Sequence, residues 1–245
     1  MLTDCHVHVS LFPGPREICE QAALHETSLI GVSCSYEDSV RNLEFASIEG
    51  YDAMIGIHPW MATQREFPAE RFEKLIYYGN VRGLGECGLD GERSPLNLQD
   101  QTHLLAGALE FADRFALPLN LHVHRAHAEM IKLLREYKER GLCGCVHNFT
   151  FSKELARDYI NCNMFLSIGR PLLKRPRRLV ESMLYAGPHR ILLESDYDHL
   201  KGPFYDGELI VKLAGVYAQI FAMTFDEACA LLEVNVRNYL DGTLP

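Results

Sequence analysis

The sequence predicts a (β/α)8 barrel, in which eight parallel strands alternate with eight helices. Short apolar segments alternate with longer amphipathic segments along the chain, there are eight of each, and 245 residues is a normal length for one such barrel. We therefore expect a single domain over residues 1–245. A doubly wound open sheet is the alternative, but it usually has fewer strands, and no G-x-G-x-x-G turn follows the first segment.

The predicted strands are apolar runs at residues 2–9, 29–34, 53–57, 81–87, 117–122, 144–147, 164–168 and 190–194. The predicted helices are amphipathic runs at residues 15–25, 37–49, 68–78, 98–115, 128–140, 153–161, 176–186 and 207–223. Thr224 and Glu227 form a capping-box sequence that begins a closing helical segment over residues 228–232. Residues 235–240 are expected to add one short turn.

The composition of the chain argues for some classes of protein and against others. Hydrophobic residues make up 47%, enough for a sizeable core, and the net charge of -9 argues against binding duplex nucleic acid through overall charge. Eight scattered cysteines without a C-x-x-C pair indicate reduced thiols in a cytoplasmic protein. No apolar run approaches about 18 residues, so no membrane span is expected. The polar residues Asp4, His6 and His8 stand where a signal peptide needs an apolar core.

The first strand carries three residues that chemistry could use. Alternation along a strand places Asp4, His6 and His8 on one face, with Cys5 and Val7 on the other. Two imidazoles at i and i+2 can bind one divalent cation, and Asp4 is placed to orient a ligand histidine through its second ring nitrogen. Taken alone, such a pair is more often two half-buried strand histidines than a metal site.

Further polar residues follow the other predicted strands. Active-site residues of such barrels lie at the C-terminal ends of the strands. The ends of strands one, three, four, five, six and eight carry His6 and His8, His58, Glu86, His122, His147 and Asp196. These residue types at the same end of one barrel predict a metal site.

Eight segments together resemble the TatD family of metal-dependent hydrolases, within the amidohydrolase-like barrels. In chain order they read D-C-H-V-H, G-I-H-P, G-E-C-G-L-D, L-P-L-N-L-H, V-H-N-F, F-L-S-I-G, I-L-L-E-S-D and N-V-R-N-Y-L. The resemblance runs essentially from end to end of the chain, in order and in spacing.

The resemblance implies two divalent metal ions. One would be held by His6, His8, Glu86 and Asp196, and the other by Glu86, His122 and His147, with Glu86 bridging ions about 3.5–4 Å apart. The ligand types favour zinc, manganese or nickel, whereas nucleases of the family are commonly linked to magnesium. Asp196 could accept a proton from the attacking water. His58 could orient a phosphate or leaving group, or serve only the Pro59 turn.

The implied activity is that of a TatD-type deoxyribonuclease, a 3′-to-5′ exonuclease on single-stranded DNA. We expect a monomer more than an oligomer. One alternative is an amidohydrolase or esterase, such as an enzyme that removes a D-amino acid from tRNA. The other is a non-catalytic partner protein on the same barrel, which six converged ligands argue against.

Several positions depart from the family pattern or have two interpretations. Val123 and His124 replace a common Ser-Arg pair; His122 is preferred over His124 as ligand by resemblance, because periodicity cannot decide, and Arg125 could replace the lost arginine. Gly91 stands where an aromatic residue is common. Asp90 is expected to support the site or its loop rather than react, and Trp60 to stack on a base or pack on the barrel.

A basic segment follows the seventh predicted strand. Its five cations are Arg170, Lys174, Arg175, Arg177 and Arg178. They could guide single-stranded DNA or another polyanion to the active-site face, or form only a solvated loop.

Overall fold

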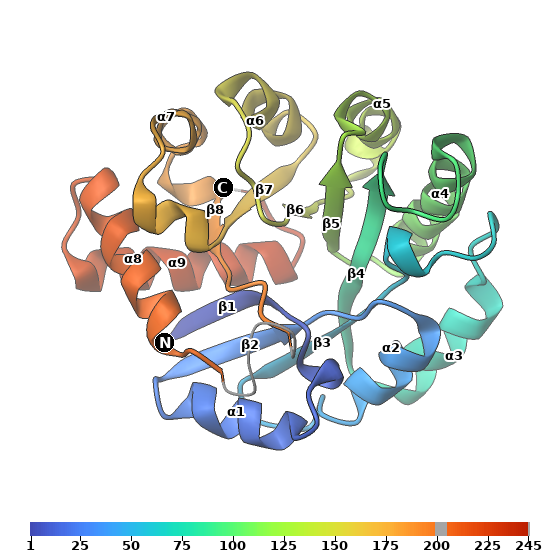
Figure 1. Cartoon of the computed structure of the whole chain (residues 1–245), viewed down its shortest axis with the longest axis horizontal. Coiled ribbons are helices and arrows are strands. Elements are labelled where there is room, and N and C mark those ends of the chain that lie inside the picture. The colour runs from blue at the N-terminus through green and yellow to red at the C-terminus, as the bar shows by residue number, and fades with distance from the viewer. Residues whose placement is uncertain (199–204, 245) are drawn as a thin grey trace.

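A computed structural model describes residues 1–198 and 205–244 and has the predicted fold. Eight parallel strands form one sheet in the order β1 to β8, and Figure 1 shows the helices surrounding them. The strands are β1 (Leu2–Val7), β2 (Thr27–Gly31), β3 (Tyr51–Ile55), β4 (Val81–Asp90), β5 (Leu119–His124), β6 (Gly144–Val146), β7 (Met164–Ile168) and β8 (Ile191–Leu193).

The helices alternate with the strands as predicted. They are α1 (Pro15–Ala23), α2 (Tyr36–Leu43), α3 (Ala69–Tyr78), α4 (Leu98–Arg114), α5 (His127–Tyr137), α6 (Lys153–Ile160), α7 (Arg177–Ala186), α8 (Glu208–Ile220) and α9 (Phe225–Leu240). Short 3-10 turns include η1 (Val9–Leu11), η2 (Pro59–Met61), η3 (Lys138–Arg140), η4 (Arg170–Lys174) and η5 (Pro188–Arg190). The predicted helix over 37–49 ends early, and its last part forms turns.

The C-terminal segment differs from its prediction. It forms one continuous helix, α9, instead of a short segment followed by a separate turn. Thr224 and Glu227 form the expected capping box. Asn235, a weak helix former, is fully buried and donates to the carbonyl oxygens of Pro188 and Ile191, both at 2.8 Å. These tertiary hydrogen bonds offset the weak local preference.

Two strands end later in the chain than predicted. β4 extends to Asp90 and β5 to His124, and these two residues are register partners. Gly88 has a φ of +154°, and a Cβ there would lie 1.9 Å from the carbonyl oxygen of His122. Only glycine therefore allows the two strands to approach here, and the pairing brings Asp90 beside His122.

The barrel closes through the segment after β8. The backbone N–H of Asp196 donates to the carbonyl oxygen of His6 at 3.0 Å, and His8 N–H donates to the carbonyl of Tyr197 at 2.9 Å. Ser195 N–H donates to the carboxylate of Asp4 at 2.8 Å. Closure of the barrel thus places Asp196 directly against the two histidines of the first strand.

The two ends of the barrel have different contents. One buried cluster joins Cys5, Met54, Cys145 and Phe165 of the strands with Tyr239 of α9. The Tyr239 hydroxyl donates to the carbonyl of the first residue of β5, and Asn235 to that of the first residue of β8. Helix α9 therefore covers the N-terminal end of the barrel, and the polar residues gather at the opposite end.

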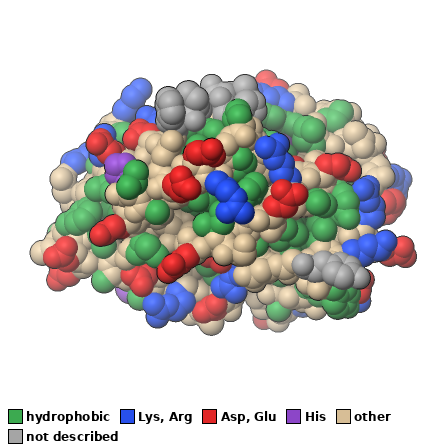
Figure 2. All heavy atoms as spheres, turned by 90° about the horizontal axis from the view of Figure 1, so that it is seen from below, with side chains coloured by type: hydrophobic (Ala, Val, Ile, Leu, Met, Phe, Trp, Pro, Cys, Tyr) green, Lys and Arg blue, Asp and Glu red, His purple; other side chains and the backbone are tan. Residues whose placement is uncertain are grey.

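The surface carries charges of both signs. On the side seen in Figure 2, acidic and basic side chains are interspersed with apolar ones. Within the described residues no single helix is long and apolar enough to cross a membrane; α8 and α9 pass that test only as a pair, on length and composition, and are bent by 106° at their junction.

We expect Asn235→Ala to lower the free energy of unfolding by about 2–4 kcal/mol, because two buried carbonyl groups lose their donor. Urea denaturation followed by circular dichroism measures this change. Val234→Ala is the matched control, since Val234 is 42% exposed on the same helix, and it should cost less than about 0.5 kcal/mol. Equal effects of the two substitutions would contradict the anchoring role of Asn235.

Candidate metal centre

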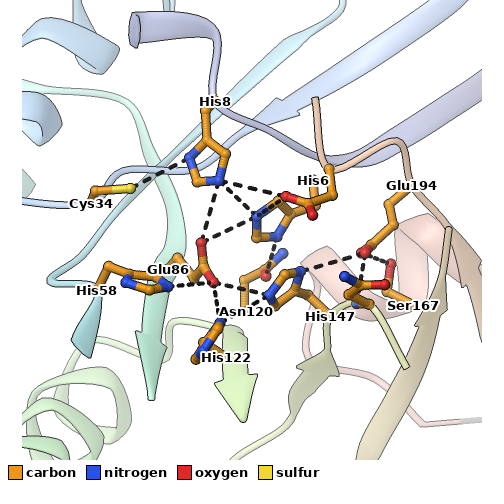
Figure 3. Close-up of polar contacts among 12 residues, drawn as sticks. His6, His8, Cys34, His58, Glu86, Asn120, His122, His147, Ser167 and Glu194 are labelled. Carbon is orange, nitrogen blue, oxygen red and sulfur yellow. Dashed lines mark hydrogen bonds and ion pairs between the residues drawn. The ribbon is translucent and has the colours of Figure 1, made fainter. Parts of the chain in front are cut away.

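The site is built around the carboxylate of Glu86. This side chain is only 2% exposed, and the register between β4 and β5 shifts between Gly85 and Cys87, at a bulge that contains Glu86. Five imidazoles converge on its oxygens, as Figure 3 shows. Their nearest nitrogens belong to His6 (3.3 Å), His8 (3.4 Å), His58 (3.1 Å), His122 (3.0 Å) and His147 (3.0 Å).

The two oxygens of Glu86 face different groups of histidines. Oε2 faces His6 and His8, whose Nε2 atoms lie 3.3 Å apart. Oε1 faces His122 Nδ1 and His147 Nε2, which are also 3.3 Å apart. Asp196 Oδ1 lies 3.9 Å from His6 Nε2 and 3.8 Å from His8 Nε2, so it belongs with the first pair. Two adjacent groups of ligand atoms therefore share one carboxylate.

The electrostatics of this centre favour positive charge. Burial alone would raise the pKa of Glu86, but His58, His147 and His6 more than offset it and hold the pKa well below its ordinary value. Burial likewise opposes a charge on His147, yet Glu86 and Glu194 raise its pKa well above normal. Burial and the neighbouring His6 lower the pKa of His8 to about 4. An ionised, buried Glu86 therefore requires cationic partners.

Hydrogen bonds at the outer ring nitrogens assign the tautomers of His6 and His122. His6 Nδ1 lies 2.8 Å from Asn120 Oδ1, and the Asn120 amide nitrogen donates to the carbonyl of Cys5, so its oxygen accepts a proton from His6. His122 Nε2 donates to Asp90 Oδ2 at 3.1 Å. With those protons on the outer nitrogens, the other nitrogen of each ring, which faces Glu86, would offer its lone pair to a metal ion.

His147 and His8 have weaker outer partners. His147 Nδ1 lies 3.5 Å from Glu194 Oε1, and no ordinary hydrogen bond reaches this buried nitrogen from the described residues. Glu194 is itself held by the backbone N–H of Asn148 and the hydroxyl of Ser167. His8 Nδ1 lies 3.5 Å from Cys34 Sγ. The Glu194 carboxylate can hold a proton on Nδ1 of His147, and a ring with its proton there would offer Nε2 to a metal ion.

His58 has the opposite tautomer. Its Nδ1 accepts the backbone N–H of Trp60 at 3.1 Å, so the proton must reside on Nε2. That N–H points at Glu86 Oε1, 3.1 Å away. His58 is therefore placed to donate a hydrogen bond rather than to bind a metal ion, although it forms a ligand-like group with Glu86 and His122 by distance alone.

The expectation that Asp4 orients a ligand histidine is wrong. The register of β1 against β2 shifts between Asp4 and Val7, which breaks the regular alternation of the strand. The Asp4 carboxylate instead accepts hydrogen bonds from Ser195 N–H and the Tyr205 hydroxyl, both at 2.8 Å. Burial raises the pKa of Asp4 to about 6. Asp4 thus supports closure of the barrel.

Sequence reasoning did not find two residues that lie against the histidines, Asn120 and Glu194. Asn120 performs the role expected of Asp4, and Glu194 lies beside His147. Both stand two positions before a candidate ligand, Asn120 before His122 and Glu194 before Asp196. The period-2 rule could have placed Asn120 on the face of His122, but not against the ring of His6 on another strand.

The structure places His122 and His124 in different surroundings. His122 lies in the centre, whereas His124 Nε2 lies 2.8 Å from Glu92 Oε2 at the edge of the cavity. Arg125 also pairs with Glu92, at 3.0 Å. Asp90 supports both the site and its loop, as expected: it orients His122, and its other oxygen accepts two backbone N–H groups at 2.9 Å.

A cavity of about 670 Å³ opens over this centre. Four carboxylates and one guanidinium line it, those of Glu86, Asp90, Asp196, Asp198 and Arg93. Among the described residues, its lining does not include the basic segment after β7. Of that segment, Arg170 pairs with Asp206 at 3.7 Å, Arg177 with Glu181 at 2.7 Å, and Arg175 donates to Gln219.

Comparisons with known proteins agree with this fold and with a metal-dependent hydrolase. A family model described as TatD related DNase matches residues 3–241. An uncharacterized metal-dependent hydrolase of Bacillus subtilis, YabD, is 27% identical over 97% of this chain and 98% of its own. The 3′-5′ ssDNA/RNA exonuclease TatD of Cronobacter sakazakii is 30% identical over 75% of this chain and 71% of its own.

A solved structure supports the fold. The TatD homologue YjjV of Escherichia coli K12 superposes with a TM-score of 0.82, at 22% identity, over 100% of this chain and 98% of its own. A barrel that gathers histidines and carboxylates at its C-terminal end is of the metal-dependent hydrolase class. Within that class, the chain belongs to the TatD family.

We expect Asn120→Ala to weaken binding of Zn²⁺ or Mn²⁺ by about 10- to 100-fold, because His6 loses the acceptor that holds its ring and tautomer. Competition with a chelating dye measures the affinity. Asn120→Asp keeps an acceptor at the same place and should bind nearly as tightly as the unaltered protein. Undiminished metal binding in the alanine variant, with folding verified by circular dichroism, would refute the orienting role.

Proposed function

We propose that this protein is a two-metal hydrolase of phosphodiester bonds, acting as a 3′-to-5′ exonuclease on single-stranded nucleic acid. The observation that carries the proposal is the position of the Glu86 carboxylate, whose two oxygens face two different pairs of histidines. A bridging carboxylate with separate ligands on each side is the arrangement that holds two cations close together.

The donor set fits divalent ions. His6, His8, Glu86 and Asp196 would hold one ion, and Glu86, His122 and His147 the other. The tautomers support this assignment, since His6 and His122 direct lone pairs inward, and His58 directs a proton. Three sets of side chains have ligand atoms close enough together to hold a metal ion. They are His6, His8 and Glu86; His6, His147 and Asp196; and His58, Glu86 and His122. Mg²⁺, Mn²⁺ and Zn²⁺ are the candidate ions.

The chain's own residues then have distinct roles. When bound, the ions would lower the pKa of a water molecule and polarise a phosphoryl oxygen. Asp196, 25% exposed beside His6 and His8, is placed to accept the proton of that water. His58 carries its proton on Nε2, which faces Glu86 Oε1; when bound ions hold that oxygen, this N–H would be free to donate a hydrogen bond to the phosphate or to the leaving oxygen. We propose Glu86, Asp196 and His58 as the catalytic residues.

A nucleic-acid substrate is supported by the relatives and by charge. A relative that is 30% identical to this chain is named a 3′-5′ ssDNA/RNA exonuclease. The carboxylates of the cavity would repel a polyanion, so substrate binding here depends on the bound cations. Outside the cavity we keep Arg170, Lys174, Arg175, Arg177 and Arg178 as candidates for guiding the strand, because η4 and α7 follow β7 at the end of the barrel that carries the site.

We also propose that residues 1–245 act as one domain, as a monomer, in the cytoplasm without membrane attachment. All eight cysteines are free thiols, and most are buried, which suits a reducing compartment.

The number of metal ions that each variant binds should distinguish the roles of His58, His122 and His124. His122→Ala should lose one of two bound ions, because a ligand is removed. His58→Ala should keep both ions yet lose activity, since His58 is proposed to donate a hydrogen bond to the substrate and not to bind an ion. His124→Ala is the matched control and should keep both ions. Elemental analysis of variants dialysed against Zn²⁺ measures the ratio; loss of an ion in the His58 variant would overturn the tautomer assignment.

We expect metal-free protein to be inactive on end-labelled single-stranded DNA and to shorten it from the 3′ end after addition of Mg²⁺, Mn²⁺ or Zn²⁺. Glu86→Gln should reduce the rate by more than about 100-fold, because the shared carboxylate is lost. Glu92→Gln, an exposed acidic residue at the cavity edge, is the control. Absence of cleavage in protein shown to bind two ions would point instead to a carbonyl substrate such as an aminoacyl ester.

A further inference from the structure

Trp60 is exposed inside the cavity that contains the metal centre. It lies on η2 (Pro59–Met61), two residues after His58, and lines the same cavity as Glu86. Its exposed fraction is 43%. Leaving a large indole uncovered next to a polar centre has no stabilising value for the fold, since burying it would remove apolar area from water.

The indole is nevertheless held in place. Its N–H donates to Asp90 Oδ2 at 2.6 Å, and Asp90 is itself fixed by backbone N–H groups of Glu92 and Arg93. The ring also contacts His58, with centroids 4.8 Å apart, and His122, at 5.9 Å. The polar edge of the indole is thus satisfied, while much of the ring stays accessible to a ligand.

A single cation accompanies this ring. Arg93 lies over the indole, with its guanidinium carbon 5.2 Å from the ring centroid, and lines the same cavity. It is exposed, and it is the only Lys or Arg among the described residues that line the cavity. An exposed aromatic ring beside one guanidinium offers a stacking surface together with a partner for one phosphate.

The position relative to the reacting centre limits what can bind. Asp90 Oδ2 accepts from both Trp60 and His122, so one carboxylate separates the indole from a candidate metal ligand. A group stacked on Trp60 therefore belongs to the part of the substrate next to the hydrolysed bond. In a nucleic acid, that group is the base of an adjoining nucleotide.

We propose that Trp60 and Arg93 form a subsite for one unpaired nucleotide beside the hydrolysed phosphate: the base stacks on Trp60, and Arg93 binds its phosphate. This subsite deepens the proposed function and rests on it. Stacking accepts any base, but requires one that has left its duplex, so the subsite selects single-stranded ends without reading sequence.

The chain contains one tryptophan, so fluorescence excited selectively in tryptophan, at a wavelength that tyrosine does not absorb, reports on Trp60 alone. The test titrates the protein, with Mg²⁺, against a short single-stranded phosphorothioate DNA that resists hydrolysis. A dye on the far end of the strand reports total binding by anisotropy. An abasic strand of equal length and charge is the matched ligand. We expect saturable quenching of Trp60 by the normal strand and little by the abasic strand.

Variants separate stacking from other roles of the residue. Trp60→Leu should weaken binding of the normal strand by about 10-fold or more and leave the abasic strand unchanged. Trp60→Phe keeps a ring but loses the N–H, and should bind within about 3-fold of the unaltered protein. Arg93→Gln should weaken both strands alike, whereas Arg65→Gln, outside the cavity, should weaken neither.

The outcomes distinguish the subsite from the function. Tight binding and metal-dependent cleavage with silent Trp60 fluorescence, or equal loss for normal and abasic strands in Trp60→Leu, would overturn the subsite and leave the exonuclease intact. Absence of both binding and cleavage of single-stranded DNA would overturn the two together. Metal content of Trp60→Leu must equal that of the unaltered protein for stacking to be the cause of weaker binding.

Discussion

The structure depends most on one buried negative charge. Glu86 lies at the centre of the barrel mouth with five imidazoles around it, and His58, His147 and His6 hold the pKa of its carboxyl well below the ordinary value. A lone carboxylate at this depth would be unstable, so histidines from the ends of four different strands must converge on it or the charge must be neutralised. Each strand therefore has to end at the right height and angle, and the barrel supplies that alignment.

The residues around the histidines turn this convergence into a defined donor set. Asn120 and Asp90 accept protons from His6 and His122, which leaves a lone pair toward Glu86 in each ring. At His58 a backbone N–H occupies Nδ1 and places the proton inward. Rings that look alike in sequence thus have opposite functions, and the difference lies in one hydrogen bond on the far side of each ring.

Barrel closure and site assembly use the same short segment. Residues 195–197 complete the sheet by hydrogen bonding to β1, and in doing so they bring Asp196 to His6 and His8. The buried Asp4 carboxylate holds this junction through Ser195 and Tyr205. The fold and the candidate metal centre are therefore interdependent at this point, whereas α9 covers the opposite end of the barrel.

The sequence by itself determined the alternation of strands and helices, because the spacing of apolar residues and the length of each segment are local properties. It also placed the converging residues at the ends of the strands. It could not determine which nitrogen each imidazole presents, why His122 rather than His124 turns inward, or that Asn120 replaces Asp4 as the orienting group. These depend on contacts between strands far apart in the chain: a bulge in β1 turns Asp4 toward Ser195, and the extended pairing of β4 with β5 brings Asp90 to His122. Only the closed barrel sets those contacts, because register and bulges are decided by neighbouring strands and not by the sequence of one strand alone.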